Sequence, residues 1–586
     1  MTPLTFIHLL GALIYAMAPY ALLAIVLSPR QSADEKTGSW IMYLPGSLAA
    51  CCLFGTSVSF RSFDMYRWTH AAILVATSAP FILRCRRQPH LLRAVFAPAS
   101  LPWPLAVVLT LTFASRVIPW LFAPESLGEG DARFHNILGF KILLDRVIPS
   151  TWEPFAPIPV MYPRGSHFLA AFLADLAGCP IHAAFDFLIV ILAVFTAAAI
   201  HRLGWLLFNN RQSAVLAAAS YSFLTVWGSL DYYRWGGIPN ALGMLLLLFM
   251  VALVIEAAEL GDLWRRRIRI LMAAATLVAI LLIHHYTWLV AVLCLCAGLI
   301  TATDRPWRRT LTATISIGAA FCLPFFLYHY LPFARTAGSS DTFSFREPIL
   351  YIWSCASNIG VCLVALFLLA WWLARHREWS AGQLFMLASS LAMFAAFVFL
   401  EYVYRGITLW VTSGKDCFTA LTPSRMLTDM VYPMAVLTGF IPLSSFWRPR
   451  AALGWLVITA AGLATCLPVW REQSRMGVSP QTVEAGRWLR EHTPANAMLV
   501  GRLPHVEYLA WRETATPPLP ASEQRRSPYV LWKEESRAVG DWLAWQTTSG
   551  RPVYFLCAPQ TPSSPPMRKL FENSEVAILT RSTDTH

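Results

Sequence analysis

Charged residues are scarce in this sequence. Asp, Glu, Lys and Arg together make up 13% of its 586 residues, about half of the share that is usual in soluble proteins. Hydrophobic residues make up 56%, and a soluble protein of this size could not bury so much apolar surface. The composition therefore excludes a soluble enzyme and a disordered chain, and it favours a protein with many membrane-spanning segments.

Metal-binding motifs are also lacking. The sequence has no Cys-x-x-Cys pair and no Cys/His spacing typical of a metal site, and most cysteines lie inside apolar runs, where they are expected to be small core residues. His284 and His285 are adjacent, so their side chains would diverge on a helix, which argues against a site in which both bind one metal ion.

Acidic residues are fewer than basic ones, and the formal net charge is +13. In a soluble protein this excess would suggest a nucleic-acid partner. In a membrane protein, Lys and Arg collect in the cytoplasmic loops, and this explains the excess without a nucleic acid. The 24 Trp and 35 Phe are typical of side chains at bilayer interfaces.

Apolar runs divide the chain into three regions. We expect accessory transmembrane helices in 1–102, a larger transmembrane module in 103–470 with a polar, Pro-rich outer loop at 123–165, and a soluble domain in 471–586. The runs long enough to cross a bilayer core of about 30 Å lie at roughly 4–27, 40–60, 67–83, 103–122, 183–200, 213–229, 238–258, 268–283, 287–302, 310–330, 349–373, 381–403, 427–446 and 451–469.

The region after Trp470 has no run of this length and reads as a small α/β domain. Helical spacing is found at 480–492, and segments at 530–546 and 565–572 also favour helices. Short strands are expected at 497–500, 552–558 and 575–580.

Basic loops predict the topology. Arginines cluster near 84–93, 265–269, 305–309, 375–377 and 448–450, and we place these loops in the cytoplasm. All five loops can lie in the cytoplasm only if one of the candidate apolar segments does not span the membrane. The segment 166–178 is the weakest candidate because it is short and carries Asp175. About fourteen spans result, with both termini and the C-terminal domain outside. The first run lacks the features of a cleavable signal peptide.

The outer loop contains the first candidate site residues. Gly128 and Gly130 bracket Glu129 and precede Asp131, and glycines let the backbone turn sharply. The stretch from Asp131 that contains His135 is amphipathic and fits a helix lying on the membrane surface. A simpler interpretation is that Asp131 only caps this helix.

Other outer segments add polar side chains beside predicted membrane boundaries. Tyr-Pro-Arg-Gly-Ser-His at 162–167, the segment 231–240, His-His-Tyr-Thr-Trp at 284–288 and the region 413–425 together supply aromatic rings, histidines and arginines. Arg binds a phosphate through two parallel hydrogen bonds, and aromatic faces suit sugar rings. The residues that we single out as substrate-binding, with Glu129 and His135, are Tyr162, Arg164, His167, Arg234, His285 and Arg425.

These features resemble the GT-C superfamily of integral-membrane glycosyltransferases. The acidic first outer loop, the turn at 162–167, the many spans, the late helix PSRMLTDMVYPMAVLTGF (423–440) and the domain entry WLREHTPANAMLV (488–500) carry the resemblance. It covers roughly 103–586 and implies a polyprenyl-phosphate sugar as donor, inversion at the anomeric carbon and an acid of the first outer loop, here Asp131, as catalytic base. The absence of a Rossmann fingerprint fits a lipid-linked donor.

The resemblance also bears on metals. Oligosaccharyltransferase members of the superfamily have a metal-binding acidic pair in this loop, which Glu129-Gly130-Asp131 matches as Glu-x-Asp, while no second Asp-x-Asp follows. A divalent metal therefore stays an open alternative, and no metal ligand is assigned.

The predicted function is transfer of a sugar from a polyprenyl-phosphate carrier to a glycan, lipid or protein acceptor outside the cytoplasmic (inner) membrane, as in cell-envelope glycan or glycolipid assembly. Two other classes remain open. A transporter or flippase of lipid-linked sugars would also have many spans, but it usually shows internal repeats, and none is evident. A non-catalytic assembly protein would not need polar clusters that converge on one face.

Overall fold

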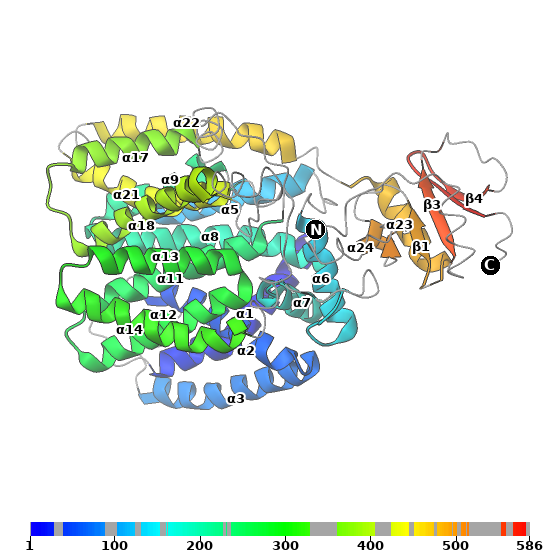
Figure 1. The fold of residues 1–586 in the computed structure, drawn as a ribbon, viewed down its shortest axis with the longest axis horizontal. Helices are drawn as coiled ribbons and strands as arrows, with labels where there is room; N and C mark the ends of the chain where they lie inside the picture. The colour runs from blue at the N-terminus through cyan, green and yellow to red at the C-terminus, as the bar shows by residue number, and fades with distance from the viewer. Residues whose placement is uncertain are drawn as a thin grey trace.

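The computed structural model describes most of the chain in segments separated by gaps. The described residues are 2–27, 39–87, 102–122, 131–152, 160, 162–226, 230, 236–327, 360–404, 423–444, 450–473, 478–494, 496–500, 506–510, 513–514, 552–557, 559 and 567–581. Within these ranges the chain forms a large helical bundle, and a small domain with a β-sheet lies beyond one end of the bundle (Figure 1).

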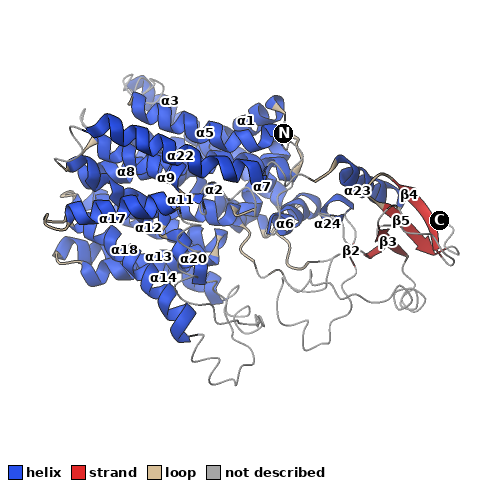
Figure 2. Ribbon diagram, turned by 90° about the horizontal axis from the view of Figure 1, so that it is seen from above, coloured by secondary structure: helices blue, strands red, loops and turns tan. Residues whose placement is uncertain are grey.

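Every apolar run predicted from the sequence contains a helix. The long helices lie side by side, with their axes roughly parallel (Figures 1 and 2). Their bounds are α1 Pro3–Leu27, α2 Ser39–Ser59, α3 Phe63–Arg87, α5 Trp103–Phe122, α8 Ile181–Phe208, α9 Arg211–Leu224, α11 Ile238–Glu259, α12 Leu263–Ile283, α13 His285–Thr301, α14 Arg305–Phe325, α17 Val361–Ala374, α18 Ala381–Val398, η4 Phe399–Tyr404, α20 Pro423–Asp429, α21 Val431–Leu437, η5 Thr438–Leu443 and α22 Ala451–Gln473.

Six helical segments of the described chain are long and apolar enough to cross a membrane. They are Pro3–Ala24, Ile181–Phe208, Ile238–Glu259, Ala381–Val398, Met426–Leu443 and Ala451–Arg471. In the most apolar part of α11, 94% of the residues are buried, against 22% for α22. Helix α11 therefore lies at the centre of the bundle and α22 at its periphery. The predicted total of about fourteen spans stays a prediction.

Two shorter helices lie at the end of the bundle that faces the C-terminal domain (Figure 1). Helix α6 covers Asp131–Asp145, as the amphipathic pattern predicted, and α7 covers Gly165–Ala177. The 13 residues of α7 span only about 20 Å at 1.5 Å per residue, less than the bilayer core. The short helix expected at 166–178 is confirmed, and its position at a membrane surface stays a prediction.

The end of α6 is joined to the first region of the chain. Arg146 follows α6 with a left-handed φ of 53°, and its guanidinium pairs with Asp64 at the start of α3 and with Asp175 on α7, the latter at 2.8 Å. It also lies 4.7 Å from the ring centroid of Phe63. Arg67 pairs with Asp175 at 3.1 Å. Helices α3, α6 and α7 thus meet in one charged cluster.

The C-terminal domain contains a mixed five-stranded sheet of order β2-β1-β3-β5-β4. Strands β2 and β3 run parallel to β1, whereas β5 runs antiparallel to both β3 and β4. The expected helix at 480–492 and the three expected strands are confirmed. The elements are α23 Pro480–His492, β1 Met498–Val500, α24 Val506–Ala510, β2 Glu513–Thr514, β3 Val553–Cys557, β4 Met567–Glu572 and β5 Ala577–Arg581.

The helix predicted at 565–572 is wrong, because Met567–Glu572 forms strand β4. A tight turn follows it, in which Asn573 Oδ1 accepts hydrogen bonds from the backbone N–H groups of Glu575 and Val576 at 3.0 and 2.9 Å. This turn brings β5 back alongside β4, and pairing with β5 outweighs the weak helical pattern of so short a segment. The helix predicted at 530–546 lies outside the described residues.

The C-terminal domain contacts the bundle through α6 and α8. Nδ1 of His182 lies 2.9 Å from the hydroxyl oxygen of Tyr508 on α24. The Tyr508 ring packs edge-on against Phe140 of α6, with centroids 5.8 Å apart, and the Arg490 guanidinium lies 5.2 Å from the Phe140 centroid. Helix α6 and the C-terminal domain therefore lie at the same end of the bundle.

Candidate functional site

Four polar segments that the sequence analysis singled out meet around the first turns of α6. They are the start of α6, the turn before α7, the start of α11 and the junction between α12 and α13. Each of these places is the end of a helix at the end of the bundle that carries the C-terminal domain (Figure 1). Helix ends expose unpaired backbone groups, so they are suitable places for polar ligands.

The backbone at the start of α6 is packed against a glycine turn. Asp131 is the first residue of α6. Gly236 has a φ of +74°, and a Cβ there would lie 2.5 Å from the Cα of Ala132. Only glycine allows this close approach with this backbone conformation. The Gly-Gly pair at 236–237 therefore brings the start of α11 against the residue that follows Asp131.

A histidine pair joins α6 to α7. Nδ1 of His135 lies 2.8 Å from Nε2 of His167, and both side chains are buried. A hydrogen bond between two imidazoles requires one to donate and the other to accept, so at least one ring is neutral. Tyr162 packs against both rings, with each centroid distance 5.6 Å. The predicted site residues His135, Tyr162 and His167 are thus in direct contact.

The α12–α13 junction lies beside this pair. The His285 ring is 5.8 Å from the Tyr162 ring, centroid to centroid. His284 caps α13, with its Nδ1 2.7 Å from Thr287 Oγ1, which is 3.0 Å from Asn240 Oδ1 on α11. The sequence placed 284–288 and Asn240 in outer polar segments, but it did not indicate that Thr287 bridges His284 and Asn240.

Glycine also sets the turn before α7 against α12. A Cβ at Gly165 would lie 3.0 Å from the carbonyl oxygen of Leu282. The guanidinium of the preceding residue, Arg164, is buried, donates to the carbonyl oxygen of Val160 and lies 5.7 Å from the Phe60 ring centroid. Arg164 therefore has partners within the protein, and its predicted phosphate contact stays a prediction.

Aromatic side chains form a wall behind the histidine pair. The Phe134 ring lies 4.6 Å from Trp152 and 5.2 Å from Tyr162, centroid to centroid, and Trp152 is completely buried. We did not select Phe134 or Trp152 as site residues. Hydrophobic residues of this kind carry no signal in a single sequence that distinguishes a site wall from ordinary core.

The pKa of His167 lies well below its ordinary value. Burial is the main cause, because it penalises the charged imidazolium, and the nearby positive charges of His135 and Arg164 act in the same direction. The predicted topology places α7 outside the spanning segments, and His167 lies in its first turn. It is therefore a neutral imidazole at neutral pH, able to donate one hydrogen bond and accept another.

Several predicted residues fall outside the described residues. Glu129 and Arg234 lie in the gaps. Asp131 and Arg425 belong to α6 and α20 by their backbones, but their side chains are not described. Among the described residues, no group of three His, Cys, Asp or Glu side chains is placed to hold a metal ion.

No family model matches the chain, and no curated protein matches it in sequence. Solved structures do match its fold. The oligosaccharyltransferase AglB from Archaeoglobus fulgidus is similar over 78% of this chain and 69% of its own, with a TM-score of 0.54 and 12% identity. ArnT from Cupriavidus metallidurans is similar over 82% of this chain and 98% of its own, with a TM-score of 0.55 and 12% identity.

The arabinofuranosyltransferase AftD from Mycobacteria is also similar, over 83% of this chain and 40% of its own, with a TM-score of 0.50 and 15% identity. These three enzymes share the fold that the sequence resemblance implied. The comparison shows the architecture, since identities this low do not carry substrates from one chain to another. The chain has the GT-C fold of integral-membrane glycosyltransferases.

Proposed function

We propose that the protein is a membrane glycosyltransferase that moves a sugar from a polyprenyl-phosphate carrier to an acceptor outside the cytoplasmic membrane. The acceptor is a glycan, a lipid or a protein, as in cell-envelope glycan or glycolipid assembly. Residues 103–470 form the catalytic module, 1–102 the accessory helices and 471–586 an extracytoplasmic domain. The structures of AglB and ArnT were determined with dolichol-phosphate and undecaprenyl phosphate, respectively, which supports a lipid-phosphate donor.

One observation carries this proposal. Helix α6 begins at Asp131, and its first turns lie against Gly236 and against the buried pair of His135 and His167. A carboxylate at this position would be held by backbone geometry beside a packed cluster of imidazoles and aromatic rings. Such a setting orients an acid toward a substrate and limits its access to water.

The transfer step follows from these groups. An acceptor hydroxyl oxygen attacks the anomeric carbon, its proton passes to the Asp131 carboxylate, and the bond from that carbon to the phosphate oxygen breaks. The electron pair leaves with the lipid phosphate. Base catalysis of this kind is typically worth about 10²–10⁴-fold in rate. Arg234 and Arg425 are proposed to hold the phosphate and stabilise its developing charge.

The buried rings would bind the sugar. Tyr162 and His285 offer aromatic faces, and His135 and His167 offer nitrogen donors and acceptors to its hydroxyl groups. A divalent ion bound by Glu129 and Asp131 stays an alternative, and the step above does not require one.

The test is Asp131→Asn in membranes supplied with a panel of radiolabelled polyprenyl-phosphate hexoses and pentoses. Asn keeps the shape of the side chain and can still cap α6, so a purely structural role predicts near-normal transfer. The proposed base predicts a loss of at least about a hundredfold. Folding and insertion are checked by size-exclusion chromatography of the purified variant.

Glu129→Gln is the matched control. Normal transfer in this variant would assign the loss in Asp131→Asn to the single carboxylate. A similar loss that changes with divalent cation would support a metal held by both residues. Full transfer by Asp131→Asn would contradict the proposal, and movement of lipid-linked sugars without transfer would favour a transporter or flippase.

A further inference from the structure

One buried threonine joins two of the segments that meet at the candidate site. Thr287 is the third residue of α13 and is completely buried. Its Oγ1 lies 2.7 Å from Nδ1 of His284, at the α12–α13 junction, and donates to Oδ1 of Asn240, in the first turn of α11, at 3.0 Å. Both partners are buried as well. A hydroxyl can donate one hydrogen bond and accept another, so a single side chain can hold both helix ends.

A glycine on α11 lets α13 come close at this place. A Cβ at Gly243 would lie 3.0 Å from both the Cβ and the Oγ1 of Thr287, so a larger residue would push the two helices apart. Asn240 and Gly243 are three residues apart on α11 and therefore lie on the same face of that helix. Thr287 thus fits between an amide and a glycine of α11.

The start of α11 also bears on α6. Gly236, four residues before Asn240, packs against the backbone of Ala132. Ala132 directly follows Asp131 in the chain. A displacement of the first turn of α11 would therefore change the space that is available to the start of α6.

The other partner of Thr287 leads to α6 by a second route. The rings of His284 and His285 lie 6.4 and 5.8 Å from the Tyr162 ring, centroid to centroid. Tyr162 in turn packs against His135 of α6. The contacts thus form a closed ring from α6 through α11 and α13 and back to α6, and Thr287 closes this ring between α11 and the α12–α13 junction.

The Thr287 hydroxyl can be removed with little change of shape. Valine resembles threonine in outline, but its side chain can neither donate nor accept a hydrogen bond. In Thr287→Val, a buried group on α11 and another at the α12–α13 junction would each lose a hydrogen bond, which favours separation of the two helix ends. Thr287→Ser keeps the hydroxyl and loses only a methyl group.

We propose that Thr287 is a positioning residue of the candidate site, which holds the first turn of α11 and the α12–α13 junction in the arrangement that places the start of α6. As far as it concerns catalysis, the inference rests on the proposed function, in which Asp131 is the base. A displacement of about 1 Å at a reacting group can cost about a hundredfold in rate. Thr287 acts through α6 and does not touch the substrate.

Hydrogen–deuterium exchange measures this positioning without any use of activity. The full-length protein is placed in phospholipid nanodiscs, and exchange in peptides from α6 is followed by mass spectrometry. We expect the amides in the first turns of α6 to exchange about fivefold faster in Thr287→Val than in the wild type, as for the loss of one net hydrogen bond. Thr287→Ser should exchange nearly as the wild type does. A purely local role of the hydroxyl would change exchange in α11 and α13 alone.

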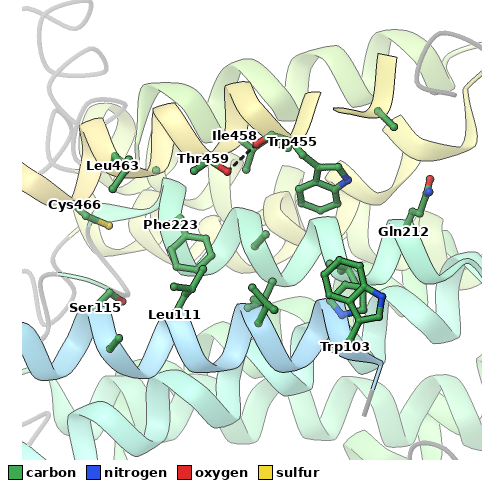
Figure 3. Close-up of a pocket in the computed structure, with 18 of the residues that line it drawn as sticks. Trp103, Leu111, Ser115, Gln212, Phe223, Trp455, Ile458, Thr459, Leu463 and Cys466 are labelled. Atoms are coloured by element: carbon green, nitrogen blue, oxygen red, sulfur yellow. Dashed lines mark hydrogen bonds between the residues drawn. The ribbon is translucent and has the colours of Figure 1, made fainter. Parts of the chain in front are cut away.

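Thr459 of α22 supplies the matched control. Figure 3 shows it beside an apolar groove between α5, α9 and α22, where its hydroxyl donates to the Trp455 carbonyl oxygen of the same helix at 2.9 Å. None of the described residues that line this groove belongs to the candidate site. Thr459→Val also removes one threonine hydroxyl, but exchange in α6 and sugar transfer should stay as in the wild type.

The effect on catalysis is measured as kcat and KM for a polyprenyl-phosphate sugar. We expect Thr287→Val to lower kcat about ten- to hundredfold in the folded protein. The change in KM should be smaller, because the arginines proposed to hold the phosphate are unaltered. Thr287→Ser should restore most of the turnover. A structural role alone would lower the melting temperature but leave kcat of the folded fraction unchanged.

Asn240→Ala examines the same hydrogen bond from the side of α11 and serves if Thr287→Val does not fold. It should accelerate exchange in α6 in the same way. Wild-type exchange in α6 in the folded variants of this pair would overturn the proposal.

Failure of this inference can be distinguished from failure of the proposed function. If exchange in α6 rises as expected but the wild type transfers no sugar, the positioning role of Thr287 stands and the proposed function fails. If transfer depends on Asp131 while Thr287→Val keeps wild-type kcat and wild-type exchange in α6, the positioning role is wrong and the transferase stands.

Discussion

Arg146 Nη1 donates a hydrogen bond to Asp175 Oδ1 at 2.8 Å and thereby joins the end of α6 to α7. The same guanidinium pairs with Asp64 of α3. Because Arg146 has a φ of 53°, its backbone is held in a conformation that costs a non-glycine residue about 1 kcal/mol or more. The ion pairs and the Phe63 contact offset this cost.

We expect Arg146→Ala to lower the free energy of unfolding by about 1–2 kcal/mol, since it removes two half-exposed ion pairs and a cation–π contact. Arg146→Gly loses the same contacts but relaxes the backbone, so it should be more stable than Arg146→Ala by about 1 kcal/mol. Thermal unfolding of the detergent-solubilised variants measures both. A wild-type melting temperature for Arg146→Ala would show that the cluster contributes nothing.

The low pKa of His167 predicts a pH dependence of stability. In the unfolded chain this imidazole takes up a proton near pH 6.5, whereas burial and the neighbouring positive charges keep it neutral in the folded protein to lower pH. Below about pH 6.5 the unfolded state therefore binds more protons, and stability falls as the pH decreases. Above that pH, His167 does not contribute to the dependence of stability on pH.

Melting temperatures between pH 5 and pH 8 test this for the wild type and His167→Gln. The substitution will change the absolute stability, so the informative quantity is the slope. The wild type should lose stability below about pH 6.5, and the variant should lose less over the same interval. Identical slopes would assign the dependence to other groups.

Two arginines are predicted to bind the donor phosphate. Arg234→Ala and Arg425→Ala should each weaken binding of a polyprenyl phosphate by more than about tenfold, because each removes a charge-assisted hydrogen bond worth roughly 1.5–3 kcal/mol. Arg→Lys should recover only part of the loss, since Lys lacks the planar fork. Unchanged affinity in both Ala variants would exclude this phosphate site.

Arg164 is the matched comparison. The sequence suggested it as a third phosphate contact, but its buried guanidinium donates to the Val160 carbonyl oxygen and lies against Phe60. We therefore expect Arg164→Ala to lower the melting temperature and, where the variant still folds, to weaken donor binding less than the other two substitutions. Thermal unfolding and lipid titration of the same sample separate the two effects.

The predicted topology places the 123–165 loop and the C-terminal domain outside the cytoplasm. Single cysteines at Ser150 and Ser522 should both react with a membrane-impermeant maleimide added to the outer side of intact cells. Helix α6 contacts α24 through Phe140 and Tyr508, so both regions should be labelled from the same side. Labelling of the two positions from opposite sides would contradict the topology predicted from the basic loops. It would also contradict the assignment of 166–178 as non-spanning.

Hydropathy predicted the helices well because burial in a bilayer or in a helical core imposes long apolar runs. The start of α6 at Asp131 followed from the glycines before it and the amphipathic residues after it. Strand β4 was missed because its six residues carry little periodicity. Its conformation is decided by β5, which follows it in the chain and supplies the antiparallel partner.

The site was predicted as a set of segments rather than as contacts. The segments containing Tyr162, His167 and His285 were expected on one face, and the structure brings those residues together. The 2.8 Å contact between His135 and His167 depends on how α6 packs on α7, and no local pattern encodes that packing. The contacts of Arg164 with Phe60 and of Arg146 with Asp64 could not be predicted for the same reason, since they join residues far apart in the chain.

Helix α6 contacts residues near the beginning of the chain and residues near its end. Arg146 ties it to α3 near the beginning, while Phe140 packs on Tyr508 close to the end, and Tyr508 is 326 positions after its other partner, His182. During synthesis, α6 therefore leaves the ribosome long before Tyr508 has been made. A nascent or truncated chain that ends before Val506 would therefore carry Asp131 on a helix that is held by α3 and α7 but lacks its contact with the C-terminal domain.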